Sequence, residues 1–308
     1  MGLLKKFLPF IGLFILAFII FEKINFNSLL KIIEKVNYVY MLLGVISTFL
    51  VVFFKMYRTH NILKQNNINL PLLNFLEIYV NANILSQVTT ILFSETTAAI
   101  ATMHNKENKT RVANVFFLCN LSDLITVLSI FSISLIFNYK TVMRVFSFNF
   151  HYKNFIGLYI IGGLILIGLF CFFIKKVLNI LLAILKDMKE TIYNSFKKII
   201  FFSIIIYGSY ILACYFNAAT FNIKIDFMFL IFVYTVGSLI NIIPISVNGL
   251  GTREAAFIFL LGIKNIPPEK AFSLSFYSFV ILILFDLAIL YSCIMVVKFF
   301  KRNRSLTY

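Results

Sequence analysis

Charged residues are scarce in this sequence, and acidic residues are the scarcest. Only 13% of the 308 residues are charged, with 12 acids against 28 lysines and arginines. Hydrophobic residues make up 61% of the chain and the mean hydropathy is +0.94, whereas soluble domains are about half apolar. These values exclude an ordinary soluble domain.

Cysteine and histidine are also rare, and neither is clustered. The four cysteines lie far apart in apolar segments without a CxxC pair, so we expect small core residues: Cys119, Cys171, Cys214 and Cys293. The three histidines are equally scattered. The sequence therefore predicts no metal site and no cofactor, and it contains no Walker motif for ATP.

Apolar segments long enough to cross a bilayer recur along the whole chain. They cover residues 7–21, 39–56, 72–103, 112–137, 155–174, 199–219, 227–262 and 271–297. The sequence thus predicts an all-α, polytopic membrane protein that forms one domain over residues 1–308. We expect its excess of cations to set the topology, and we expect no nucleic-acid partner.

Two of these segments differ from simple spans. Segment 72–103 carries many polar residues, and segment 227–262 is interrupted by Pro244 and two glycines. If both return to their own side as re-entrant hairpins, the inside loops hold about twice as many lysines and arginines as the outside loops. This arrangement places both termini in the cytoplasm and the protein in the cell (inner) membrane.

The same arrangement divides the chain into two halves, residues 1–137 and 138–308. Each half has two spans, a hairpin and a third span, so the halves have opposite orientations. This is the inverted-repeat plan of many transporters. A weak internal similarity between "ILFSETTAAIA…NLSDL" and "LGTREAAFIF…LFDL" favours it. Between the halves, residues 176–198 have an apolar stripe opposite lysines, which predicts an interfacial helix on the cytoplasmic surface.

The break in segment 227–262 reads "IIPISVNGLGTREAAF". Proline stops a helix, and the freed backbone is tolerated in a membrane only beside protein or a water-filled cavity. Gly249 and Gly251 allow positive φ and close backbone approach. A helix that restarts near Thr252 would direct N–H groups at the cavity, which favours an anion.

Arg253 is unfavourable at such a helix start, whereas Glu254 suits it. A charge at membrane depth costs about 2.5–3.5 kcal/mol on insertion scales, which argues for a role. One interpretation is that Arg253 attracts an anionic head group such as phosphate. The other is that Arg253 pairs with Glu95, Asp123 or Asp286 and locks the hairpins together.

Other polar residues leave similar alternatives open. Asp123 and Asp286 are either paired structural acids or substrate sites, and Glu95 lies in the hairpin opposite Arg253. Asn248, like Asn241, either lines the cavity or caps freed backbone. Arg58 follows the second span, where it is either a positive-inside residue or a contact for a lipid phosphate.

The stretch from Ile242 to Gly262 resembles the signature of the lysylphosphatidylglycerol synthase transmembrane region, also called the flippase-like domain family. The matching positions are Pro244, Gly249, Gly251, Arg253, Glu254, Ala255 and Ala256. "MYRTHNILKQNNINL" is similar to the family's arginine-containing segment, and residues 91–124 are similar to its first polar hairpin, without the usual proline and glycine. The chain resembles only the membrane domain of this family, without its synthase domain.

The resemblance implies a protein that moves lipids between leaflets. We expect no enzymatic activity, because no histidine, cysteine or clustered acid pair supplies a second catalytic group. Its expected substrate is a phospholipid or polyprenyl-phosphate lipid, whose phosphate would meet Arg253 and the Gly249–Thr252 backbone. Glu95, Asp123, Glu254 and Asp286 would order Arg253 or meet an amine. The alternatives are a scaffold subunit for a separate synthase or glycosyltransferase and a membrane-embedded lipid transferase. Homo-oligomers are a further option.

Overall fold

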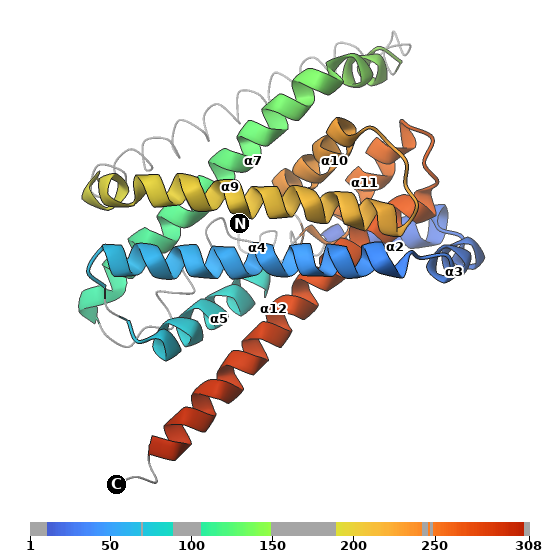
Figure 1. Ribbon diagram of the computed structural model, residues 1–308. Helices are drawn as coiled ribbons and strands as arrows, with labels where there is room; N and C mark the ends of the chain where they lie inside the picture. The colour runs from blue at the N-terminus through green and yellow to red at the C-terminus, as the bar shows by residue number, and fades with distance from the viewer. Residues whose placement is uncertain are drawn as a thin grey trace, which may run out of the picture.

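The computed structural model describes residues 11–68, 70–88, 106–148, 189–241, 246 and 249–304. Every regular element in these residues is a helix, as predicted (Figure 1). The helices are α2 (Ile11–Lys23), α3 (Phe26–Glu34), α4 (Tyr38–Gln65), α5 (Leu72–Val88), α7 (Lys106–Phe148), α9 (Lys189–Thr220), α10 (Phe227–Ile240), α11 (Thr252–Gly262) and α12 (Pro268–Arg304).

Three described helices contain stretches that are long and apolar enough to cross a membrane. These stretches are Tyr38–Gln65 in α4, Arg111–Met143 in α7 and Ser195–Thr220 in α9. A fourth is possible if α2 and α3, which meet at 91°, are taken together. Several large apolar side chains remain exposed on these helices, as expected for surfaces that face lipid: Phe14, Phe18, Phe21, Ile136 and Ile204.

The long helices α4 and α9 lie side by side and run in opposite directions (Figure 1). At one end, the Asn37 N–H donates to the Thr220 carbonyl at 3.0 Å. At the other end, Asn66 Nδ2 donates to Ser195 Oγ at 2.9 Å. One helix belongs to each predicted half, so this antiparallel pair joins the two halves.

Three helices end in the same kind of turn, built on an asparagine with positive φ. Asn67, Asn222 and Asn265 have φ angles of 57°, 52° and 56°. In each turn the following isoleucine N–H donates to a carbonyl five residues earlier, which caps the helix end in a Schellman motif. The pairs are Ile68 with Leu63 at 3.0 Å, Ile223 with Ala218 at 3.1 Å and Ile266 with Leu261 at 3.2 Å.

Helices α10 and α11 form a hairpin. They have 14 and 11 residues, so each is only about 15–20 Å long at 1.5 Å per residue and cannot cross a 30 Å hydrocarbon core. Lys264 Nζ lies 2.9 Å from Asp226 Oδ2, which brings together the two ends of the hairpin. The chain therefore enters and leaves this hairpin at the same end of the molecule, as expected for segment 227–262.

The predicted boundaries need correction in two places. Helix α9 is continuous from Lys189 to Thr220, so the separation between an interfacial helix ending at 198 and a span starting at 199 is wrong. Neither glycine nor proline lies near residue 198 to end a helix there. Helix α4 also continues beyond residue 56, to Gln65. Segment 155–174, residues 176–188 and the second part of 72–103 lie outside the described residues.

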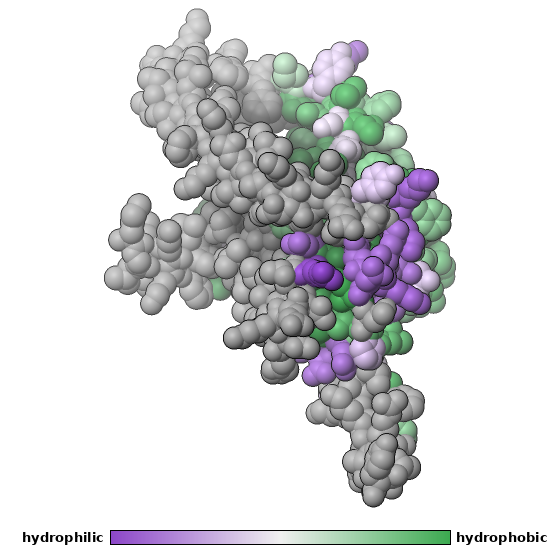
Figure 2. Space-filling model, turned by 90° about the vertical axis from the view of Figure 1, so that its left-hand side faces the viewer, coloured by the Kyte–Doolittle hydropathy of each residue, from purple (hydrophilic) through white to green (hydrophobic). Residues whose placement is uncertain are grey.

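Two apolar cores support the bundle. One joins the end of α4 to α5 and the first part of α7 and includes Cys119. The other joins α9, α10, α11 and α12 and includes Cys214. Both cysteines are free and buried, as expected for small core residues. Figure 2 looks onto the end where α4 ends and shows hydrophilic surface gathered there beside hydrophobic surface.

Candidate functional site

The loop between α10 and α11 requires glycine at two positions. Gly249 and Gly251 have φ angles of 77° and 86°, in the region that favours glycine. A Cβ atom at Gly249 would overlap Asn241 Oδ1, and one at Gly251 would overlap the Gly12 carbonyl of α2. The expected positive φ and close backbone approach are both present, and α2 is the element that packs on this loop.

Helix α11 begins with a set of local hydrogen bonds. Glu254 Oε2 accepts from the Gly251 N–H at 2.6 Å, which is the carboxylate half of a capping box. Thr252 Oγ1 donates to the Gly249 carbonyl at 3.1 Å and lies 2.8 Å from Ser246 Oγ. The Gly251 N–H is therefore not free for a ligand.

Arg253 is buried, with 9% of its surface exposed, and its guanidinium reaches α12. Its Nε donates to Ser275 Oγ at 3.1 Å, and its Nη2 donates to the Ser275 carbonyl at 2.9 Å and to Glu254 Oε1 at 3.2 Å. The guanidinium carbon lies 4.9 Å from the centre of the Phe279 ring, within cation–π range. None of the described residues accepts a hydrogen bond from Nη1.

Glu254 is the acid that neutralises Arg253. It is 1% exposed, and its Oε1 also accepts from Ser275 Oγ at 2.8 Å. Both carboxylate oxygens therefore have donors inside the protein. Asp123, one of the predicted alternatives, is not the partner of Arg253, because Arg58 engages it instead.

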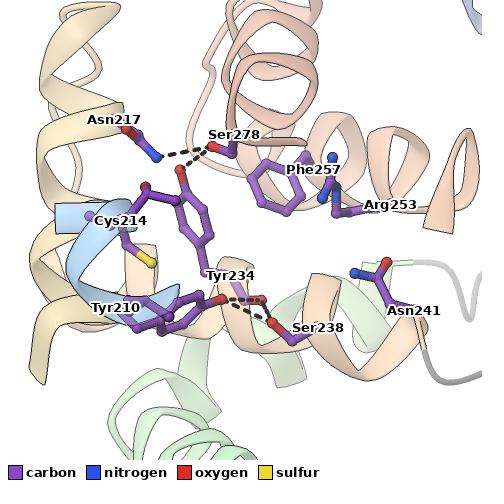
Figure 3. Close-up of a pocket in the computed structure, with 12 residues that line it drawn as sticks. Tyr210, Cys214, Asn217, Tyr234, Ser238, Asn241, Arg253, Phe257 and Ser278 are labelled. Atoms are coloured by element: carbon purple, nitrogen blue, oxygen red, sulfur yellow. Dashed lines mark hydrogen bonds between the residues drawn. The ribbon is translucent and has the colours of Figure 1, made fainter. Parts of the chain in front are cut away.

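A cavity of about 130 Å³ lies beside Arg253, and its lining residues come from α4, α9, α10, α11 and α12. Figure 3 shows these residues. Asn241 lines it as well. Its Oδ1 packs against Gly249 and accepts no hydrogen bond from the described residues. Among its 12 lining residues Arg253 is the one that carries a formal charge. The lining is Thr48, Val51, Tyr210, Ala213, Cys214, Asn217, Tyr234, Ser238, Asn241, Arg253, Phe257 and Ser278.

The far wall of the cavity is a network of hydroxyl and amide groups (Figure 3). The Tyr234 hydroxyl lies 3.0 Å from Ser278 Oγ, which also accepts from Asn217 Nδ2 at 3.3 Å. The Tyr210 hydroxyl lies 2.9 Å from Ser238 Oγ. These residues are absent from our sequence-based site. The sequence feature that could have identified them is the presence of tyrosine, asparagine and serine within otherwise apolar helices.

Arg58 occupies a different place from the one predicted. It lies within α4, is 2% exposed, and donates to Asp123 Oδ1 at 2.7 Å and Oδ2 at 3.1 Å. Ser122 Oγ accepts at 3.2 Å and the Cys119 carbonyl at 3.4 Å. Neither interpretation from the sequence included this pairing with α7, which keeps the guanidinium inside the protein. Neither Arg58 nor Asp123 lines the cavity.

The structure thus brings together five of the predicted residues and separates two others from them. Gly249, Gly251, Thr252, Arg253 and Glu254 form the tip of the hairpin and the start of α11. Arg58 and Asp123 form a separate pair. Glu95 and Asn248 lie outside the described residues, and Asp286 lies in α12 with its side chain outside the described part.

The apolar helices and the buried polar site at a broken hairpin define a multi-pass helical membrane protein. A family model described as the lysylphosphatidylglycerol synthase TM region matches residues 7–289, nearly the whole chain. The chain belongs to this family, which suggests a function connected with membrane lipids. Comparisons with curated proteins and with solved structures gave no match.

Proposed function

We propose that this protein is a lipid flippase that passes a head group between leaflets through the cavity beside Arg253. The proposal rests on the burial and the hydrogen bonding of Arg253. It is buried, two of its nitrogens are held by Ser275 and Glu254, and no described residue accepts a bond from Nη1. A cation fixed in this way beside a cavity can receive a phosphate oxygen.

A second donor group at the cavity supports an anionic ligand. No described residue accepts a hydrogen bond from Asn241 Nδ2, which points toward the cavity in Figure 3. The substrate would therefore be a phospholipid or polyprenyl-phosphate lipid, with its phosphate at Arg253 and its chains in the bilayer. The protein would catalyse no covalent step, and transport would be passive or coupled to an ion gradient.

The cavity is smaller than an ordinary ligand pocket, which has roughly 300–1,000 Å³. Its volume of about 130 Å³ suits a phosphate group but not a whole lipid head group. We therefore propose that the described arrangement is occluded and that the α10–α11 hairpin moves to admit substrate. The close contact of Gly251 with Gly12 makes α2 the neighbour that must shift with it.

We also propose that the two halves form an inverted repeat with both termini in the cytoplasm of a cell membrane. The antiparallel helices α4 and α9 support this, because each is the second span of its half. The turns after these two helices also match. Asn67 and Ile68 follow α4, and Asn222 and Ile223 follow α9. In each case the next helix, α5 or α10, begins five residues after the asparagine. A matched turn in opposite orientations is expected of a duplicated, inverted unit.

The test is leaflet exchange in liposomes that contain a head-group-labelled lipid and an impermeant quencher. Panels of anionic, zwitterionic and polyprenyl-phosphate lipids would be compared. A hydrogen bond to a charged group contributes about 1.5–3 kcal/mol, so Arg253→Ala should lower the exchange rate roughly 10- to 100-fold. Lys224→Ala, at an exposed lysine in the loop before α10, is the control and should exchange at the wild-type rate.

Equal exchange by wild type and Arg253→Ala, with both correctly folded, would exclude Arg253 as the phosphate contact. Absence of exchange for every lipid would favour a scaffold subunit for a separate synthase or glycosyltransferase. A covalently altered lipid in the same liposomes would instead favour a lipid transferase.

A further inference from the structure

Helix α3 is a short helix at a sharp corner of the chain. It begins after Asn25, whose side-chain oxygen accepts from the N–H groups of Asn27 at 3.0 Å and Ser28 at 3.3 Å. This cap starts a new helix directly after α2, and the two axes meet at 91°. If α2 crosses the membrane, α3 must therefore run along its surface.

One face of α3 packs on the protein. Leu29 and Ile32 are three residues apart, so they share a face, and both contact the apolar clusters formed with α11 and α12. This contact fixes the orientation of the helix about its own axis. Six of its nine residues are exposed.

The exposed part is divided between an apolar and a polar stripe. Phe26, Leu30 and Ile33 follow helical spacing and are exposed by 62%, 58% and 51%. Asn27, Lys31 and Glu34 follow the same spacing one residue later and are all exposed. At 3.6 residues per turn the two stripes lie roughly 100° apart. A helix with separate protein-facing, apolar and polar faces suits a boundary among protein, lipid and water.

The surroundings of α3 place it at the end of the bundle where chain turns gather (Figure 1). Asn25 N–H donates to Glu269 Oε1 at 3.3 Å, at the start of α12. Asn222 Nδ2, in the turn before α10, donates to the Lys35 carbonyl at 3.2 Å. Exposed aromatic residues flank the helix on both sides, Phe21 at 85% and Tyr38 at 70%. Exposed apolar and aromatic residues thus border α3 on both neighbouring helices, α2 and α4.

We propose that α3 is an interfacial membrane helix at this end of the protein. Phe26, Leu30 and Ile33 enter the boundary between head groups and acyl chains, about 5–10 Å deep, while Asn27, Lys31 and Glu34 face water. The occupant of the apolar stripe is the bilayer itself, because the stripe adjoins apolar surface on both neighbouring helices. The helix fixes the depth of α2, which packs on the candidate site at Gly251.

The absence of tryptophan from the chain permits a direct test. Leu30→Trp and Lys31→Trp would each give a single fluorophore on adjacent stripes of α3. The full-length variants would be placed in liposomes at low protein density, with either brominated lipids or aqueous acrylamide as quencher. Leu30→Trp should lose most of its emission with shallow bromines and little with acrylamide. Lys31→Trp should behave in the opposite way.

Three results would overturn the proposal. Equal quenching of both variants by acrylamide would place the whole helix in water. Equal quenching of both by brominated lipid would place it within the bilayer core. Protection of Leu30→Trp from both quenchers would mean that a second copy of the chain covers the stripe. None of these results would affect the proposed lipid exchange, which is measured separately.

Discussion

Two buried arginines among the described residues have acidic partners, and they differ in how many of their donors are used within the protein. Arg58 connects α4 to α7, and Asp123 holds it through both carboxylate oxygens. Arg253 pairs with its own neighbour in sequence, Glu254, and reaches Ser275 on α12. Both arginines connect two helices, but Arg253 also lines the cavity.

This comparison shows that burial and charge alone do not separate a structural pair from a binding site. Both arginine residues are at most 9% exposed. Both η-nitrogens of Arg58 have acceptors within the protein, and its Nε, which has none, is itself buried. Arg253 differs because it lines a cavity and retains a donor that no described residue uses. A binding arginine is therefore better distinguished from a structural one by a donor that a ligand can reach than by burial or charge.

The largest effect is expected for Arg58→Ala. The change would leave the buried Asp123 with the partly exposed Lys55 as its ionic partner. Breaking a buried pair typically costs about 3–5 kcal/mol. The variant should show a large loss of thermal stability in detergent or nanodiscs. Combining it with Asp123→Ala should restore part of this loss, because the second change removes the stranded carboxylate.

A matched control is Lys55→Ala. Lys55 Nζ lies 3.3 Å from Asp123 Oδ2, but its side chain is 36% exposed, so the change should cost less than about 1 kcal/mol. If Arg58→Ala were as stable as Lys55→Ala, the pair would not hold α4 to α7. Arg58 could then no longer serve as the example of a structural arginine in the comparison with Arg253.

A smaller effect is expected for Gly251→Ala. A non-glycine residue at φ 86° costs about 1–3 kcal/mol, and the added Cβ would overlap the Gly12 carbonyl. Because Arg253 follows two residues later, its position should shift, and lipid exchange should fall along with stability. Thermal unfolding and leaflet exchange of the same preparation would measure both.

Gly208→Ala is the control for this change. Gly208 lies within α9, and a Cβ there would meet no atom within 4 Å. Alanine in a helix is favoured over glycine by about 0.5–1 kcal/mol, so this variant should be as stable as wild type or slightly more stable. Wild-type exchange in Gly251→Ala would show that the tight contact with α2 is unnecessary for function.

The hairpin could be predicted from the sequence because its signals are local. Gly249 and Gly251 indicated a chain break with positive φ, and adjacent charges within an apolar segment indicated a buried site. The pair of Arg58 with Asp123 could not be predicted, because the residues are 65 positions apart and only the packing of α4 on α7 brings them together. Ser275 was missed for the same reason, since its role depends on the contact between α11 and α12.

Ser275→Ala should have the smallest effect of the three changes, and it tests how Arg253 is oriented. The change removes the acceptor of Nε and one donor to Glu254, but it keeps the carbonyl that holds Nη2. Loss of such hydrogen bonds typically costs about 1 kcal/mol, so thermal stability should fall slightly. Leaflet exchange should fall several-fold, because the guanidinium can then rotate away from the cavity.

Ser292→Ala, at an exposed serine farther along α12, should leave both measurements unchanged. Exchange at the wild-type rate in Ser275→Ala would mean that Glu254 alone orients Arg253, and the binding role would then rest on the adjacent pair within α11.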